Sequence, residues 1–338
     1  MHGKFLDYAP RLLSDPRRRR LFHRMAERAG IERRYSVLEP ADEAERLDRS
    51  GHFTPGRQPA TRARMELFER HAPALAEAAV EKLALTPDER PTHLLVTTCT
   101  GLHAPGIDLH LQDVLGLPGS IERTVIGFMG CYAAINGLKA AHHIVRSDPE
   151  ARVLMVNIEL CTLHMQEVDD LEAILSFLLF ADGCAATLVT ARPAGLAVEG
   201  FHAAVIPDSA PHITWRTGDI GFDMHLSGEV PNTIARGLPG LLADLRDRSE
   251  VPFDTWAVHP GGRSVLDAVE RCLELPPEAL EASRAVLRQY GNMSSPTIMF
   301  VLAELMERAA PGRGLAMAFG PGLTAETMAF HPTGGGGA

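Results

Sequence analysis

The sequence predicts an α/β protein with a largely parallel, buried sheet. Short apolar segments with the character of strands alternate along the chain with longer segments of helical periodicity. Strands followed at once by helices are typical of such a sheet. The 338 residues are 45% hydrophobic and 22% charged, a balance that is ordinary for a globular protein. A chain of this length can bury a large core, and we expect two lobes or one large unit.

The first element is a helix, because Asp15 can cap it, Pro16 suits its first turn and Gly30 ends it. An alanine-rich helical stretch, 62–85, follows, and we expect Pro73 to break or bend it. Strands are expected at 92–98, 122–128, 152–158, 185–190, 196–206, 256–258, 314–319 and 325–330. Further helices are expected at 133–145, 171–179, 234–245, 263–273, 277–289 and 297–309.

The two halves of the chain show a hint of duplication. Each contains a strand, a turn with a reactive side chain and a helix, in VIGFMGCYAAINGL around Cys131 and in TWAVHPGGRSVLDAVE around His259. Two such units facing each other across a pseudo-twofold axis would bring these side chains together. We expect an N-terminal half, 1–192, and a C-terminal half, 193–338, with a flexible glycine-rich tail at 331–338.

Charge and cysteine content narrow the function classes. A net charge of −10 argues against nucleic acid as the main partner. The longest uncharged apolar run, 174–181, is far shorter than a membrane span, and the start MHGK lacks the apolar stretch of a signal peptide. We therefore expect a cytoplasmic protein. Its five cysteines include no CxxC pair, which favours free thiols.

Cys131 is the strongest single candidate for a catalytic residue. It lies between a predicted strand and the start of a predicted helix, and Gly130 before it permits a sharp turn. The helix N-terminus can stabilise a thiolate there. Most free cysteines are buried small apolar residues, but this placement resembles a nucleophile elbow.

His259 and Asn292 complete a possible Cys–His–Asn set. His259 ends a short apolar strand before a Pro-Gly-Gly turn, and Asn292 lies in a loop before a helix. We expect the imidazole to hold the thiol as a thiolate–imidazolium pair and the amide to bind an oxyanion. The order fits a papain-like hydrolase or a thiolase-fold condensing enzyme. The hydrolase is the weaker alternative, because the CGSCW-type signature and a secretory start are missing.

Four blocks of sequence resemble the type III polyketide synthases, the chalcone synthase superfamily. They are GFMGCYAAINGLKAAHHIVRSDP, AVHPGGRSVLDAVE, YGNMSSPTIMFVL and AFGPGLTAET. The similarity extends over 5–330, nearly the whole chain. It implies a thiolase-like five-layered αβαβα fold built from two duplicated βαβ-rich halves, and a homodimer. It also implies an upstream strand with a Gly-Thr-Ala segment, so we expect either an earlier start or a rebuilt sheet edge.

The resemblance also implies a mechanism. Cys131 would take an acyl group from a starter CoA thioester, and His259 with Asn292 would stabilise the enolate formed when malonyl-CoA loses CO2. The enolate would attack the thioester, and repeated cycles would precede cyclisation to a pyrone, resorcinol, phenol or naphthol. No metal or redox cofactor is expected, in keeping with the lack of metal-ligand spacing and of GxGxxG. Alternatives are a ketoacyl synthase III-like enzyme that condenses once on a carrier protein, and an idle thiolase-fold binding protein.

Further positions take their roles from the resemblance. Phe180 and Met224 stand at the gatekeeper positions, where methionine is a departure that gives a softer gate. The pocket wall is implied to contain Cys99, Thr100, Glu159, Cys161, His164, Ser176, Trp215, Ser294 and Pro321. The CoA contacts are implied to be Arg24, Arg28, Gly261 and Ser264.

Three other features depart from the family pattern or lack a counterpart in it. Trp215 replaces a glycine on the cavity floor, so we expect a smaller or redirected pocket. Ala104 replaces the residue that family members insert into the partner's active site. Arg17 and Arg20 share a helix face with Arg24 and Arg28 but have no match in the family, so a solvated face is sufficient to explain them.

Overall fold

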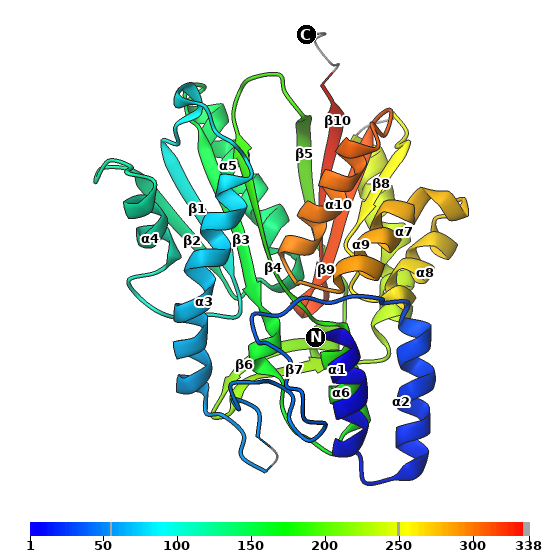
Figure 1. Cartoon of the computed structure of the whole chain (residues 1–338). Coiled ribbons are helices and arrows are strands. Elements are labelled where there is room, and N and C mark those ends of the chain that lie inside the picture. The colour runs from blue at the N-terminus through cyan, green and yellow to red at the C-terminus, as the bar shows by residue number, and fades with distance from the viewer. Residues whose placement is uncertain (55, 249–250, 334–338) are drawn as a thin grey trace.

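The computed structural model describes residues 1–54, 56–248 and 251–333. They form two four-stranded sheets and one separate hairpin (Figure 1). The first sheet has the order β2 (Glu122–Gly127), β1 (His93–Thr98), β3 (Val153–Leu160), β4 (Asp182–Val189). The second has the order β5 (Leu196–Val205), β10 (Thr324–Pro332), β9 (Gly314–Gly320), β8 (Thr255–Val258). The hairpin is β6 (Ile213–Gly218) with β7 (Gly221–Leu226).

The prediction of a largely parallel sheet is confirmed for the first sheet, where two of three pairings are parallel, and wrong for the second, where two of three are antiparallel. Strand β1 is parallel to β2 and β3, and β8 is parallel to β9. Strand β4 runs antiparallel to β3, and β10 runs antiparallel to β5 and β9. The reason is connection length: β9 reaches β10 through a three-residue 3-10 turn, and so short a link joins only antiparallel neighbours.

The layers follow from which helices cover which sheet face. Helices α5 (Ala133–Ser147) and α10 (Pro296–Glu307) lie between the two sheets and share one apolar cluster with both. Helices α3 (Thr61–Glu81) and α4 (Ile107–Val114) cover the outer face of the first sheet. Helices α7 (Val230–Arg248) and α8 (Arg263–Cys272) cover the second, and α9 (Glu281–Tyr290) packs beside α10 and β8. This is the expected five-layered αβαβα arrangement.

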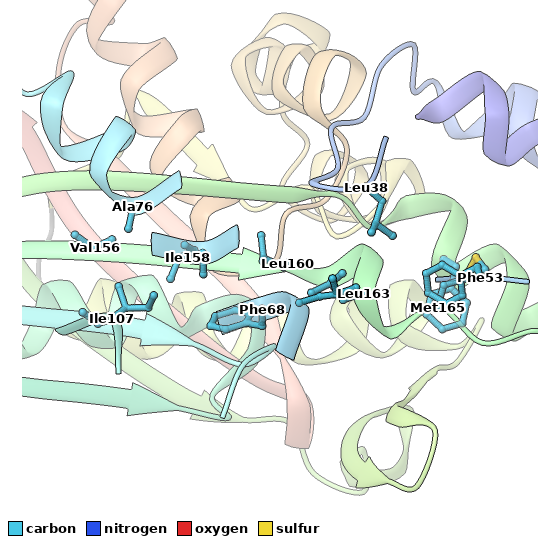
Figure 2. Close-up of a cluster of buried hydrophobic side chains, with 14 of the residues drawn as sticks. Leu38, Phe53, Phe68, Ala76, Ile107, Val156, Ile158, Leu160, Leu163 and Met165 are labelled. Carbon is cyan, nitrogen blue, oxygen red and sulfur yellow. The ribbon is translucent and has the colours of Figure 1, made fainter. Parts of the chain in front are cut away.

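Close packing at the centre depends on small residues of α5. Its buried positions include Ala133, Ala134, Gly137 and Ala141. A Cβ at Gly137 would approach the Met155 sulfur to 2.7 Å, so only glycine allows the helix to lie this close to the first sheet. On the opposite face of that sheet, large side chains of α3, β3 and the following loop fill the core (Figure 2).

Several local predictions are confirmed. Helix α2 (Pro16–Ala29) begins where the Asp15 side chain accepts from the Arg17 N–H, and it ends at Gly30 with φ +68°. Helix α6 (Leu171–Leu179) has the predicted bounds. Pro73, however, does not break α3, whose buried residues on both sides of the proline hold the helix together by packing.

Some elements were not predicted. They are α1 (His2–Tyr8), α4 and the β6–β7 hairpin. The flexible tail was expected to begin at His331, but His331 and Pro332 belong to β10. His331 Nδ1 also lies 2.9 Å from a Glu199 carboxylate oxygen. Residues 334–338 lie outside the described part. No described helix is long and apolar enough to cross a membrane, and the cytoplasmic location stays a prediction.

Candidate active site

Cys131 lies in a tight turn between the first sheet and the central helix α5. Strand β2 ends at Gly127, Phe128 and Gly130 both have positive φ (+56° and +71°), and a short 3-10 turn carries Cys131 into α5. A Cβ at Gly130 would lie 2.5 Å from Pro321 Cδ, so the turn needs glycine for space as well as for its φ. The chain thus presents the thiol to the space between the two halves, as the sequence predicted.

His259 follows β8 in the second half and faces the same cavity as Cys131. Its backbone N–H donates to the Met317 carbonyl at 2.8 Å, which fixes the end of β8 against β9. The side chain is 1% exposed, and neither ring nitrogen has a hydrogen-bond partner among the described residues. A buried imidazole whose two nitrogens are both free is available to a substrate, because buried polar atoms otherwise find partners.

Asn292 is held by its backbone and by its amide. Its N–H donates to the Leu179 carbonyl at 2.8 Å, and its carbonyl accepts from the Ala181 N–H at 2.8 Å. Its side-chain Oδ1 accepts from the Ser294 N–H, and Nδ2 donates to the Gly261 carbonyl at 3.3 Å. Since Nδ2 carries two hydrogens, the second can reach the Cys131 thiol or a ligand in the cavity that Asn292, Cys131 and His259 all line.

The protonation of the site differs from the expected thiolate–imidazolium pair. Burial raises the pKa of the Cys131 thiol to about 11, although hydrogen bonds from Ser294 and Asn292 act in the opposite direction. Burial lowers the pKa of His259 to about 3. The cause is desolvation, which disfavours both charged forms. Desolvation therefore favours the neutral thiol and the neutral imidazole over the charged pair.

This protonation state predicts the pH dependence of Cys131 alkylation. Only the thiolate reacts, so the rate constant with iodoacetamide should rise about tenfold per pH unit from pH 7 to pH 9 without a plateau. Mass spectrometry of the Cys131 peptide measures this rate, and Cys131→Ala identifies labelling elsewhere. A plateau that begins below pH 7 and disappears in His259→Gln would contradict the neutral resting state and restore the ion pair.

Glu159 lies behind the site and does not line it. Its carboxylate is fully buried and accepts from the Cys99 N–H at 2.9 Å, the Thr100 hydroxyl at 2.7 Å and the Ser295 hydroxyl at 2.9 Å. Burial raises the pKa of Glu159 to about 7, and these hydrogen bonds oppose the rise. The expectation of a pocket-wall residue is therefore wrong: Glu159 joins the ends of β1 and β3 to the loop before α10.

His164 is also buried behind the wall, contrary to expectation. Its Nε2 lies 2.8 Å from the Thr100 carbonyl, and its Nδ1 accepts from the Phe222 N–H at 3.1 Å. These partners require a neutral ring protonated at Nε2, and burial lowers the pKa of His164 to about 3. The ring stacks on Phe222 at 4.2 Å and meets Trp215 edge-on at 5.5 Å. His164 therefore supports the cavity floor from below.

Trp215 forms that floor. Its indole Nε1–H donates to the Cys99 carbonyl at 2.8 Å, which ties the β6–β7 hairpin to the end of β1. The cavity between Trp215 and Cys131 has a volume of about 30 Å³. Of the predicted wall residues, those that line it are Cys99, Thr100, Cys161, Trp215, Ser294 and Pro321. The inner cavity is small and the indole forms part of its lining, while a shrinkage relative to the family stays a prediction.

A larger cavity of about 530 Å³ leads from Cys131 to the surface. Phe180 and Met224 line both this cavity and the inner one, which is where gatekeepers would lie. Ser176 lines the outer cavity, away from the inner one. Two of the four predicted CoA contacts, Gly261 and Ser264, also line it.

The other two predicted CoA contacts, Arg24 and Arg28, are exposed on α2 and do not line the cavity. Helix α2 contributes Arg18 and Met25 to its lining instead. The structure thus places α2 beside the opening, with the predicted arginines on the neighbouring surface. Ala104 is exposed and distant in sequence from every lining residue of the outer cavity.

Arg34 is a positioning residue that the sequence did not reveal. Its buried guanidinium donates to the carbonyl oxygens of Phe177, at 2.8 Å, and of Phe180, and its Nε donates to His2 Nδ1 at 3.0 Å. It thereby fixes the end of α6, from which the Phe180 gate and the backbone partners of Asn292 extend. Nothing in the arginine-rich sequence distinguishes it from its neighbours. No cluster of three or more potential metal ligands occurs in the described ranges.

The chain is similar to known proteins over nearly all of its length. Models of the N-terminal and C-terminal domains of chalcone and stilbene synthases match residues 12–193 and 199–333. Alpha-pyrone synthesis polyketide synthase-like Pks18 of Mycobacterium tuberculosis is 32% identical over 342 residues, covering 96% of this chain and 85% of that protein. Bisdemethoxycurcumin synthase of Oryza sativa is 35% identical over 339 residues, covering 92% and 83%.

Solved structures are similar as well. PKS-I from the brown alga Ectocarpus siliculosus superposes with a TM-score of 0.86 at 29% identity, covering 98% of this chain and 94% of that one. The 1,3,6,8-tetrahydroxynaphthalene synthase from Streptomyces coelicolor A3(2) superposes with a TM-score of 0.86 at 27% identity, covering 99% and 95%.

Proposed function

Because the chain belongs to the chalcone and stilbene synthase family, we propose that Cys131, His259 and Asn292 are the catalytic residues of this type III polyketide synthase. Enzymes of this family are CoA-dependent acyltransferases that carry out malonyl-CoA condensations without a cofactor. The observation that carries the residue assignment is convergence: three side chains from separate elements of both halves line one cavity of about 530 Å³.

Loading begins from the neutral pair. The Cys131 sulfur attacks the carbonyl carbon of the starter thioester while its proton passes to His259. The bond between that carbon and the CoA sulfur then breaks, and the CoA thiolate leaves with the proton that His259 returns. The acyl group remains on Cys131, and His259 is neutral again, as its low pKa favours.

Condensation uses the same neutral imidazole as a hydrogen-bond donor. Malonyl-CoA loses CO2, and the electron pair of the broken carbon–carbon bond becomes an enolate. The imidazole N–H of His259 and the free amide hydrogen of Asn292 stabilise the enolate oxygen. The enolate carbon attacks the Cys131 thioester, and the Cys131 sulfur leaves. Neither step requires a base to remove a carbon-bound proton.

We expect Cys131→Ala to separate decarboxylation from condensation. Without the nucleophile, polyketide formation from malonyl-CoA and a panel of acyl-CoAs should fall by at least about 1,000-fold. Decarboxylation of malonyl-CoA to acetyl-CoA should continue, because His259 and Asn292 remain. Liquid chromatography with mass spectrometry measures both, and Cys272→Ala, on α8 outside both cavities, is the control. Unchanged polyketide formation in Cys131→Ala would overturn the assignment.

The small size of the inner cavity favours a short polyketide product. The cavity has a volume of about 30 Å³, against about 530 Å³ for the outer cavity, so the space between Trp215 and Cys131 offers a growing chain little room. Elongation must proceed toward the outer cavity, which Phe180 and Met224 border. We propose few extensions followed by lactonisation to an α-pyrone. The Mycobacterium tuberculosis relative is named for α-pyrone synthesis.

Trp215→Gly tests this shape argument. Removing the indole opens the inner cavity, so the mean product should gain at least one malonyl unit while the rate of malonyl decarboxylation stays within about twofold. Trp256→Phe, which changes the other tryptophan of the chain in its contact with Phe253, is the matched control. Equal losses of product length and decarboxylation would show that Trp215 acts on stability and not on cavity shape.

We propose that the enzyme is a homodimer of chains with two related halves, 1–192 and 193–338. Strand β2 supports the pairing, because it is an edge strand whose residues are largely exposed on both faces, with Val125 53% exposed. An unpaired sheet edge with an exposed valine favours pairing with a second copy.

We expect Val125→Lys to weaken that dimer, because a charge would be buried at the seam. Light scattering after size-exclusion chromatography measures the mass, with Val205→Lys on exposed β5 as the control. A Val125→Lys protein that keeps the mass of a dimer would place the interface elsewhere.

A further inference from the structure

Helix α2 carries an unpaired arginine face, which we define as Arg17, Arg20, Arg24 and Arg28. The four side chains are spaced by three or four residues and therefore share one side of the helix. All four are exposed, and none makes an ion pair or a side-chain hydrogen bond among the described residues. Such a concentration of free positive charge is unusual on a chain whose net charge is −10.

This face adjoins the opening to Cys131. Met25 and Arg18 of the same helix line the outer cavity. Leu21 lies between Met25 and the arginine face when the side chains are followed around the helix axis. Leu21 is 37% exposed and Met25 is 40% exposed, so apolar surface lies between the cavity opening and the charges.

The neighbouring acidic groups are already engaged. Asp169 pairs with Arg18 at 3.8 Å, Asp170 accepts from the Ala173 N–H, and Glu172 accepts from the Gly228 N–H. They do not neutralise the arginine face, because none of them forms an ion pair with its four side chains in the described part of the chain. Glu27 borders the arginine face on the flank away from Leu21, where it lines a separate groove with His23 and Ala29.

A single CoA molecule does not account for the whole surface. The arginine face extends for about 16 Å along the helix. The family resemblance assigns Arg24 and Arg28 to CoA phosphates, which leaves Arg20, one turn from Arg24, and Arg17, a further turn away, without a ligand. Exposed Leu21 adds apolar area that phosphate groups do not need, whereas protein interfaces combine apolar contacts with a charged rim.

We propose that the arginine face, with Leu21 and Met25, is a docking surface for an acidic acyl carrier protein that delivers the starter group. The carrier's acidic helix would lie against α2, and its acyl-phosphopantetheine arm would enter the outer cavity to reach Cys131. This inference rests on the proposed function. Charge complementarity and the position beside the cavity opening identify the occupant, since a membrane surface or a free anion would not require the path to Cys131.

The transfer needs no new chemistry. The Cys131 sulfur attacks the thioester carbon on the carrier's arm, its proton passes to His259, and the bond to the pantetheine sulfur breaks. The pantetheine thiol leaves with that proton, still attached to the carrier. Extension with malonyl-CoA then proceeds as before.

Charge reversal at the two unassigned arginines tests the proposal. The full chain and Arg17→Glu/Arg20→Glu are compared with one acyl group, chosen as the best starter among CoA thioesters. It is supplied either as acyl-CoA or on the phosphopantetheine arm of an acidic type II acyl carrier protein. We expect kcat/KM with the acyl carrier to fall about tenfold or more in the variant, and to fall with added salt in the wild type, while kcat/KM with acyl-CoA changes less than about twofold.

The control is Arg70→Glu/Arg146→Glu, which makes the same charge change at two exposed arginines of α3 and α5 and should affect the rate with neither substrate.

Product from acyl-CoA but none from the acyl carrier would overturn this proposal and leave the proposed function intact. An equal loss with both substrates would assign the arginine face to CoA. Vesicle binding that the variant abolishes, with carrier-dependent activity unchanged, would assign it to an anionic membrane. Failure to form product from acyl-CoA would instead overturn the proposed function.

Discussion

The site depends on one short stretch of backbone pairing between the two halves. Asn292, from the second half, donates its N–H to the Leu179 carbonyl and accepts from the Ala181 N–H, so Phe180 pairs with it across the boundary. This pairing fixes the amide that faces Cys131 and the ring that borders both cavities. Arg34 supports the same stretch from behind. Because main-chain hydrogen bonds constrain position more tightly than side-chain packing does, the gate and the oxyanion donor are held as one unit.

Exclusion of water decides how the catalytic pair works. The same burial raises the pKa of the Cys131 thiol and lowers that of His259, so it favours the neutral form of both groups. The arrangement suits an imidazole that must donate a hydrogen bond to an enolate in each cycle, because a neutral ring can donate without repeatedly losing a proton. The cost is a less reactive nucleophile during loading, when proton transfer has to accompany attack.

Local signals in the sequence predicted much of this molecule, and long-range ones did not. Asp15 and Gly30 mark α2 because capping is a matter of neighbouring residues, and Gly130 marks the turn at Cys131 for the same reason. The docking of Trp215 onto the Cys99 carbonyl and the burial of Glu159 and His164 depend on contacts between distant segments, and so does the pairing of β5 with β10. The resemblance assigned Glu159 and His164 to the pocket, but a family pattern does not distinguish a residue in the wall from one behind it. The position of Cys131 before a helix predicted a thiolate from the sequence, whereas the desolvation that favours a neutral thiol becomes visible only in the folded chain.

The β6–β7 hairpin separates two tasks within the enzyme. Trp215 and Met224 face each other across its register, and it is anchored at its far end through the Thr61 hydroxyl and the Gly221 N–H. None of Cys131, His259 and Asn292 belongs to it. Substitutions in this hairpin can therefore alter the volume offered to the growing chain while the reacting groups stay in place. New products can therefore evolve through substitutions in this strand pair while the catalytic residues and their reaction stay the same.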